Sequence, residues 1–69
     1  MKVSIYSYDN NLLRPTKHLE CIYEHEGSLD KVKIITHALE WVRAHRSNMQ
    51  HPFVSIVLRY DGFEVTYNF

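Results

Sequence analysis

Glycine is scarce in this 69-residue chain, which contains only Gly27 and Gly62. Nucleotide-binding loops need several glycines close together to cradle a phosphate, so this class of site is excluded. Cysteine is scarcer still, because Cys21 stands alone and no internal disulfide can form. A lone cysteine suits a reducing compartment, and we therefore expect a cytoplasmic protein.

The chain also lacks an excess of either charge. Eight Lys and Arg residues balance eight Asp and Glu residues, whereas proteins that bind nucleic acid non-specifically usually carry a basic excess. No apolar run approaches the length of a membrane span, and no signal-peptide core is evident, so no membrane association is expected. With 45% apolar residues, residues 1–69 are predicted to form a single globular domain.

What the sequence does contain is a clear β-hairpin in residues 54–69. Asp61-Gly62 separates two alternating runs, and Asp-Gly favours a two-residue turn in which both residues have positive φ. The apolar face of this hairpin pairs Tyr60 with Phe63, Leu58 with Val65, Ile56 with Tyr67 and Val54 with Phe69. The opposite face pairs Arg59 with Glu64, Val57 with Thr66 and Ser55 with Asn68. One face therefore suits a core, and the other suits water or a partner.

Two strands and a helix are predicted before the hairpin. Residues 2–8 alternate, with Val3 and Ile5 on one face. Residues 18–25 form a second strand, predicted to point Leu19, Cys21 and Tyr23 inward and Glu20, Ile22 and Glu24 outward. A helix follows from about residue 29 to about residue 46, with Ser28 as its N-cap. This order predicts an α+β fold in which one helix packs on a four-stranded antiparallel or mixed sheet.

The predicted helix is apolar over more of its circumference than one small sheet can bury. A stripe predicted to face the core contains Val32, Ile35, Leu39 and Val42. A second stripe, about 80–100° away at about 100° per residue, contains Ile34, Ala38 and Trp41. Leu12 and Leu13 can fold over Ile34 and Trp41. Alternatively, Ile34 and Trp41 contact another protein, with Trp41 as the anchor.

No constellation of residues predicts catalysis or metal binding. The five histidines lack the paired spacings that are usual for zinc ligands, and zinc needs three or four converging ligands. Cys21 is predicted to point inward, where a thiol stays protonated and unreactive. We therefore expect no enzymatic activity, no catalytic residue, no metal and no cofactor.

The sheet face away from the helix has several possible roles. Tyr6 and Tyr8 project from it, together with Phe53, Val57 and Ile22. Aromatic residues on an open sheet can stack bases, but Glu20, Glu24 and Glu64 are predicted to share this face and would repel phosphate. Tyrosines also favour strands for reasons unrelated to binding. A further alternative is the pairing of two sheet faces or edges in a homodimer.

Two segments carry a resemblance to a known class of proteins. Residues 28–41, which begin Ser28-Leu29-Asp30 and end Ala38-Leu39-Glu40-Trp41, are similar to the helix of phage-encoded inhibitors of bacterial RNA polymerase. Residues 62–66, Gly-Phe-Glu-Val-Thr, resemble the last strand of the same inhibitors. The resemblance covers less than half of the chain and implies a small protein that inhibits a host enzyme or defence complex; no site residue is carried over.

The favoured hypothesis is a non-enzymatic protein-binding module, a phage or mobile-element inhibitor that occludes a surface of a larger host complex. Its partner-binding residues are predicted to be Ile34, Trp41, Tyr6 and Tyr8. If the chain is phage-encoded, it is expected to act in the host cytoplasm. The alternatives are a nucleic-acid-binding accessory protein that uses the open sheet face and a homodimeric structural protein.

Overall fold

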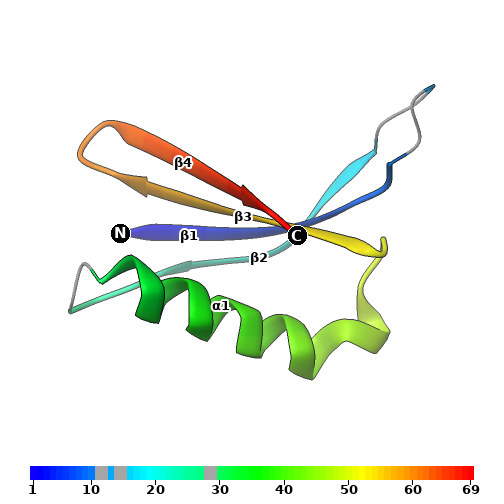
Figure 1. Cartoon of the computed structure of the whole chain (residues 1–69), viewed down its shortest axis with the longest axis horizontal. Helices are drawn as coiled ribbons and strands as arrows, with labels where there is room; N and C mark the ends of the chain where they lie inside the picture. Colours follow the sequence, from blue (N-terminus) through cyan, green and yellow to red (C-terminus); the bar gives the residue numbers. More distant parts are fainter. Residues whose placement is uncertain (11–12, 14–15, 28–29) are drawn as a thin grey trace.

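The computed structural model describes residues 1–10, 13, 16–27 and 30–69, which form one sheet and one main helix (Figure 1). The elements follow the order β1 (Lys2–Tyr8), β2 (Lys17–Glu24), α1 (Lys31–His45), η1 (Arg46–Asn48), β3 (Phe53–Tyr60) and β4 (Phe63–Asn68). In space the strand order is β2-β1-β3-β4, and each neighbouring pair is antiparallel. The α+β class and the order strand, strand, helix, strand, strand are confirmed, and the sheet is antiparallel.

The hairpin of β3 and β4 has the predicted register. Tyr60 lies opposite Phe63, and the pairing continues without a shift to Ser55 opposite Asn68. Asp61 and Gly62 have φ values of 48° and 80°, as a two-residue turn with two positive φ angles requires. On the polar face, Arg59 Nε lies 3.1 Å from Glu64 Oε2.

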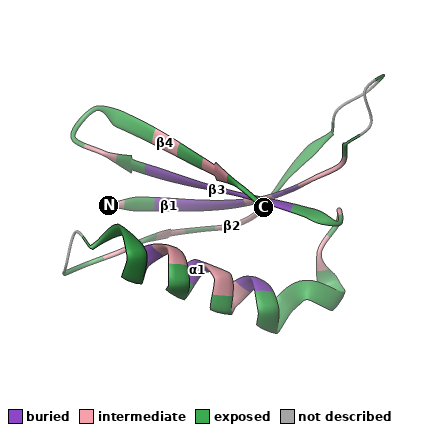
Figure 2. Cartoon of the chain, in the orientation of Figure 1, coloured by how far each residue is buried: buried purple, intermediate pink, exposed green. Residues whose placement is uncertain are grey.

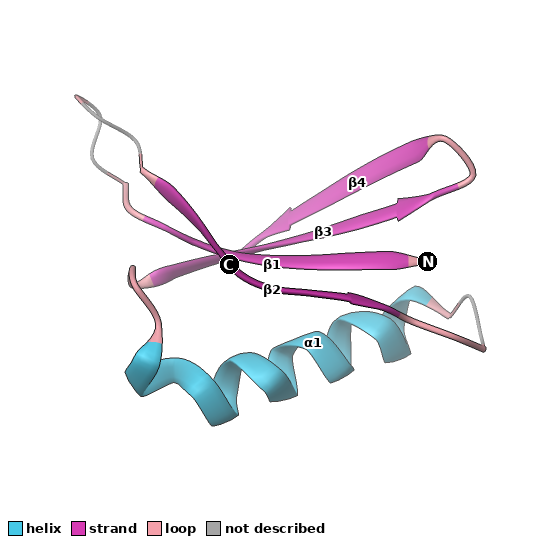
Figure 3. Cartoon of the chain, turned by 180° about the vertical axis from the view of Figure 1, so that it is seen from behind, coloured by secondary structure: helices cyan, strands magenta, loops and turns pink. Residues whose placement is uncertain are grey.

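The core lies between the helix and one face of the sheet, which Figures 1 and 3 show from opposite sides. The strands contribute Val3, Ile5, Val54, Ile56 and Leu58, and the helix contributes Ile34, Ala38 and Val42. All five strand residues belong to β1 and β3, the two central strands. The helix is therefore centred over the middle of the sheet.

The predicted core stripe of the helix is wrong in part. Val42 is buried, but Val32 is 74% exposed, and Ile35 and Leu39 are half-buried. The residues that face the sheet are Ile34, Ala38 and Val42, which combine two members of the second stripe with one member of the first. The two predicted stripes lie towards opposite sides of the apolar arc, and small Ala38, between Ile34 and Val42, allows close approach to the strands.

Strand β2 also differs from its prediction, because it contains a bulge. Cys21 lies opposite Ile5, but Leu19 lies opposite Tyr6, so Glu20 is an extra residue and the alternation of side chains is reversed beyond it. Leu19, predicted to point inward, is exposed on the outer face with Tyr6. Glu20, predicted to point outward, accepts hydrogen bonds from Ser7 Oγ at 2.6 Å and from the backbone N–H of Gln50 at 2.8 Å.

The helix begins later than predicted. Asp30 is the N-cap, and its Oδ1 accepts hydrogen bonds from the backbone N–H groups of Val32 at 3.0 Å and Lys33 at 3.4 Å. Ser28, the predicted cap, lies outside the described residues, as does Leu12. Leu13 is 92% exposed, so it does not cover the helix as one prediction required.

Within the described part of the chain, no helix has the length and apolar character needed to cross a membrane.

Candidate interaction surfaces

The side chains that point away from the helix form four rows across the sheet, a side that we call the outer face. In order along the strands, the rows are Glu24, Lys2, Arg59 and Glu64; Ile22, Ser4, Val57 and Thr66; Leu19, Tyr6, Ser55 and Asn68; and Lys17, Tyr8 and Phe53. The first row holds charges of both signs, and the last two rows hold the aromatic rings. The outer face is thus charged at one end and largely apolar towards the other.

Among the described residues of the outer face, Leu19, Ile22 and Phe53 are exposed large apolar side chains. Tyr6 and Tyr8 are half-buried beside them, whereas the smaller Ser4, Ser55 and Val57 are buried. We call Tyr6, Tyr8, Leu19, Ile22 and Phe53 the outer patch. Contiguous apolar surface of this kind commonly marks an interaction site.

Several contacts hold the aromatic rings of the outer patch in place. The rings of Tyr8 and Phe53 stack with centroids 5.5 Å apart and an interplanar angle of 29°. Tyr8 Oη also donates a hydrogen bond of 3.3 Å to the carbonyl of Phe69. The Lys17 ammonium lies 4.4 Å from the centroid of the Tyr6 ring, within range of a cation–π interaction.

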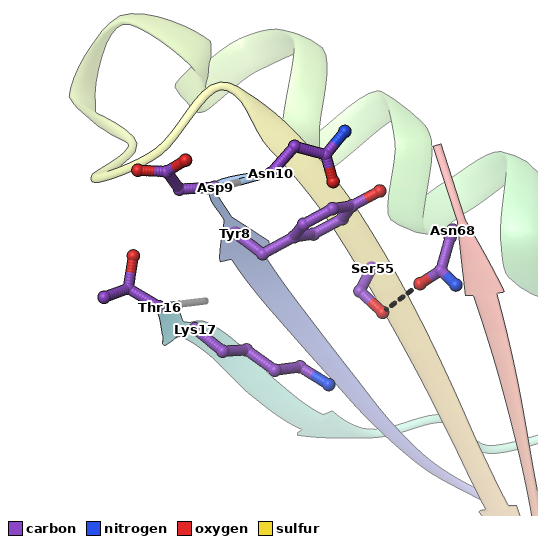
Figure 4. A pocket seen from close by; sticks show the side chains of 7 residues that line it. All are labelled: Tyr8, Asp9, Asn10, Thr16, Lys17, Ser55 and Asn68. Atoms are coloured by element: carbon purple, nitrogen blue, oxygen red, sulfur yellow. Dashed lines mark hydrogen bonds between the residues drawn. The ribbon is translucent and has the colours of Figure 1, made fainter. Parts of the chain in front are cut away.

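A hollow lies beside the Tyr8 end of the patch (Figure 4). It is lined by Tyr8, Asp9, Asn10, Thr16, Lys17, Ser55 and Asn68. Its lining includes one carboxylate and one ammonium, and Ser55 Oγ donates a hydrogen bond of 2.9 Å to Asn68 Oδ1 across the β3–β4 pair. No group of three or more potential metal-ligating side chains occurs there or elsewhere in the described residues.

The predicted contact residues of the helix lie on the other side of the sheet. Ile34 is fully buried in the core, so the prediction that it contacts a partner is wrong. Trp41 is half-buried, and its ring stacks on His45 with centroids 4.1 Å apart. It borders a gap between α1 and β2 together with Cys21, Tyr23 and His37. The sheet therefore separates Trp41 from Tyr6 and Tyr8, and the four predicted residues do not form one surface.

The ionisable groups near β2 have shifted pKa values with identifiable causes. Burial raises the pKa of the Cys21 thiol, which is therefore protonated at neutral pH. Burial and the neighbouring Cys21 raise the pKa of Tyr23. The hydrogen bond from Ser7 is the main cause of the lowered pKa of Glu20, so this carboxylate is ionised at neutral pH.

A second exposed apolar surface, which the sequence analysis missed, lies between α1 and β4. Phe63 is 67% exposed and Phe69 is 49% exposed on the helix side of the sheet, and Ile35 and Tyr67 line a groove with the exposed Val32. We call these five residues the β4 flank. Figure 2 shows that β3 is buried for most of its length, whereas β4 beside it is mostly exposed. The signal in the sequence was the three apolar residues of β4 together with Phe69 directly after it, more than one helix centred on β1 and β3 can cover.

Comparison of the chain with protein-family models, with curated proteins and with solved structures finds no significant match.

Proposed function

We propose that this protein is a non-enzymatic protein-binding module whose contact surface is the outer patch. The supporting observation is that Leu19, Ile22 and Phe53 expose large apolar side chains on a sheet face that no element of the described chain covers. An antiparallel sheet commonly leaves one face to water, but such a face is then mainly polar. Each large apolar side chain that a partner buries contributes about 1.5–3 kcal/mol.

The contacts of the two tyrosines of the outer patch suit these side chains to act as anchors. Tyr8 is fixed by its stack on Phe53 and by its hydrogen bond to Phe69, and Tyr6 lies beneath the Lys17 ammonium. Side chains that are already ordered lose less conformational entropy on binding, which increases affinity. Tyrosine is also among the residues enriched at the centres of protein interfaces.

We further propose that the partner is a larger host complex and that the chain inhibits it by covering a surface, in the host cytoplasm, as a phage or mobile-element protein. The support for this narrower proposal is the resemblance of residues 28–41 and 62–66 to phage-encoded polymerase inhibitors. A sheet face suits occlusion because it covers a surface without entering a cleft.

One observation favours nucleic acid as a second candidate partner. Glu20 points away from the outer face, and Lys17 lies over the Tyr6 ring, so the aromatic end combines stacking groups with a cation. Against this proposal, Asp9 lies beside Lys17 at the same end, and the chain has no net positive charge to attract a phosphate backbone.

Capture of proteins from a bacterial lysate tests the proposed contact and separates the two candidates. The variant Leu19→Lys/Ile22→Lys places two cations on exposed positions of the outer patch. It is expected to lose a stoichiometric protein partner that the unmodified chain retains. Ala44→Lys, which adds a cation at an exposed position of the helix, is the matched control and is expected to retain the partner.

The same variants discriminate against nucleic acid. Added lysines strengthen binding to a phosphate backbone, so a nucleic-acid partner would be bound more tightly by Leu19→Lys/Ile22→Lys, with a steep salt dependence. Equal capture of one protein by the double variant and the control would contradict the proposed contact surface. Salt-sensitive binding of a random single-stranded oligonucleotide that weakens on Tyr6→Ala would favour the second candidate.

A further inference from the structure

Strand β4 forms one edge of the sheet and has a backbone edge that faces away from β3. Phe69 N–H donates to the Val54 carbonyl at 2.8 Å, and Val54 N–H donates to the Phe69 carbonyl at 3.4 Å. In an antiparallel pair such doubly bonded residues recur at every second position. The N–H and C=O groups of Glu64, Thr66 and Asn68 therefore point towards the open edge.

The sequence of β4 carries few of the features that protect an edge strand from pairing. It contains no proline, no lysine and no bulge against β3, and Glu64 is its only charged residue. Its helix-side residue Phe63 is exposed, and so is Phe69 directly after the strand. An edge strand of this composition is a template for another strand.

We propose that two copies of this chain pair through β4 in antiparallel orientation, with Thr66 opposite Thr66 of the second copy. This register places Phe63 opposite Phe69, Val65 opposite Tyr67 and Glu64 opposite Asn68. Apolar residues then meet apolar residues on the helix side of the sheet. On the outer face, Glu64 meets a neutral amide, and the two glutamates are kept apart.

The hydrogen-bonding geometry selects this register. A two-fold axis at Thr66 lets the outward groups of Glu64, Thr66 and Asn68 form three residue pairs, each of which exchanges two backbone hydrogen bonds. A shift of the axis to Val65 or Tyr67 leaves two such pairs. An axis between Val65 and Thr66 places apolar side chains opposite polar ones, because side chains alternate along a strand.

The pairing accounts for the unpartnered apolar surface of the β4 flank. Directly opposed side chains lie on the same side of an antiparallel sheet, so both helices lie on one face of an eight-stranded sheet, and the aromatic residues of both β4 strands form the floor between them. Because edge pairing covers these rings mainly from one side, the interface is smaller than the about 800 Å² per partner of a standard complex. The dimer is therefore expected to depend on concentration.

The opposite edge explains why assembly stops at two copies. Pairing across a two-fold axis consumes both β4 edges and leaves only the two β2 edges exposed. Strand β2 carries Lys17, two glutamates and the bulge at Glu20, all of which oppose further strand addition. The outer patches of both copies stay open, so this dimer goes beyond the proposed partner contact and does not depend on it.

Sedimentation velocity of the full chain over a range of concentrations tests the association. The sedimentation coefficient is expected to rise with concentration for the unmodified chain, and Thr66→Pro is expected to weaken the dimer by about tenfold or more. The N–H of Thr66 points to the open edge, so proline at this position removes no bond to β3. Phe63→Lys, at a 67% exposed position, provides a second disrupting variant in case Thr66→Pro fails to fold.

Disulfide trapping tests the register independently. In a Cys21→Ser background, Thr66→Cys places two cysteines about 5.5 Å apart between Cα atoms, within the range that a disulfide spans. Glu64→Cys is the matched control, because its copies lie four residues apart along the strands, or roughly 14 Å. Thr66→Cys is expected to form a disulfide-linked dimer much faster than Glu64→Cys. Equal rates, or a chain that sediments as a monomer at all concentrations, would overturn the proposal.

Discussion

The two edges of the sheet differ in how well they are protected. At the β2 edge, the bulge at Glu20 and the charge of Lys17 interrupt the strand, and Trp41 and His37 of the helix border the gap over Cys21. At the β4 edge, the strand is regular, and Phe63 is largely exposed. In one copy of the chain both edge strands leave backbone groups without a neighbouring strand, but β4 has fewer features that oppose the pairing of another strand.

This difference follows from the position of a single helix over the two central strands. Ile34, Ala38 and Val42 face β1 and β3, so each edge strand is covered only by the sides of the helix. On the β2 side the helix presents the large ring of Trp41, and on the β4 side it presents the shorter Val32 and Ile35. The single helix thus covers β4 less well than it covers β2.

The largest expected effect distinguishes the packing of the two edges. Trp41→Ala is expected to lower the free energy of unfolding by about 2–3 kcal/mol, somewhat less than for a fully buried ring, because Trp41 is half-buried. Phe63→Ala, at the exposed β4 flank, is expected to cost less than about 1 kcal/mol in the monomer. Urea unfolding at low protein concentration measures both values. Equal losses would contradict the difference in cover.

The turn that positions β4 provides the second test. Gly62→Val is expected to destabilise the chain by about 2 kcal/mol, because a β-branched residue is strained at a φ of 80°. An added Cβ at this position has no heavy atom within 4 Å, so the cost is conformational and not steric crowding by neighbours. Gly62→Asn, which tolerates positive φ, is the control and is expected to cost clearly less in the same thermal or urea unfolding experiment. Matching stabilities for the two variants would contradict a strained turn.

The bulge of β2 provides a smaller effect with a defined pH dependence. Glu20→Ala is expected to cost about 1 kcal/mol at neutral pH, because the buried Ser7 hydroxyl loses its partner. The folded state lowers the pKa of Glu20, so the ionised carboxylate stabilises the fold at pH values above its unfolded pKa. This contribution is lost as the pH falls through the lower folded pKa. Unfolding free energies measured at neutral and strongly acidic pH are expected to differ more for the unmodified chain than for Glu20→Ala.

A matched control separates the hydrogen bond between Ser7 and Glu20 from the general effect of removing a carboxylate. Glu26→Gln removes an exposed carboxylate just beyond β2 and is expected to leave both values nearly unchanged. If Glu20→Ala behaves like Glu26→Gln, the bulge is not held by Glu20.

The smallest effect concerns the only charge on β4. Glu64→Gln removes an ion pair with Arg59 in which both side chains are about half exposed. Exposed pairs of this kind contribute little, so the unfolding free energy of the monomer is expected to change by less than about 0.5 kcal/mol. A loss above about 1 kcal/mol in urea unfolding would mean that β4 depends on its own charges and not on its pairing with β3.

The hairpin could be predicted from the sequence because its signals are local. Asp61-Gly62 sets the turn, and two residues of turn fix the register of every following pair. The same alternation correctly placed Tyr6 and Tyr8 on the outer face of β1. The part of the outer patch that lies on β1 could therefore be predicted from the sequence alone.

The remaining features depend on contacts between distant residues. No local pattern marks Glu20 as an extra residue, because the bulge is held by Ser7 and Gln50, 13 and 30 positions away. The prediction of β2 therefore misplaced Leu19, a member of the outer patch. The one available signal was Ser7, a polar residue on the inward face of β1 that needs a hydrogen-bond partner. Similarly, periodicity showed how wide the apolar arc of the helix is, but only the docking angle decides that Ile34 and not Val32 is buried.

Amide hydrogen exchange, followed residue by residue by NMR at low and high protein concentration, tests the difference between the two edges most directly. The amides of Glu64, Thr66 and Asn68 are expected to exchange freely in dilute solution and to become protected at high concentration. Met1 and His25 exchange two hydrogen bonds, so by alternation along β2 the amides of Ile22 and Glu24 point outward. These two amides are expected to exchange at the same rate at both protein concentrations. Concentration-independent exchange at Thr66 in a folded chain, or protection that appears at Ile22 instead, would contradict the account.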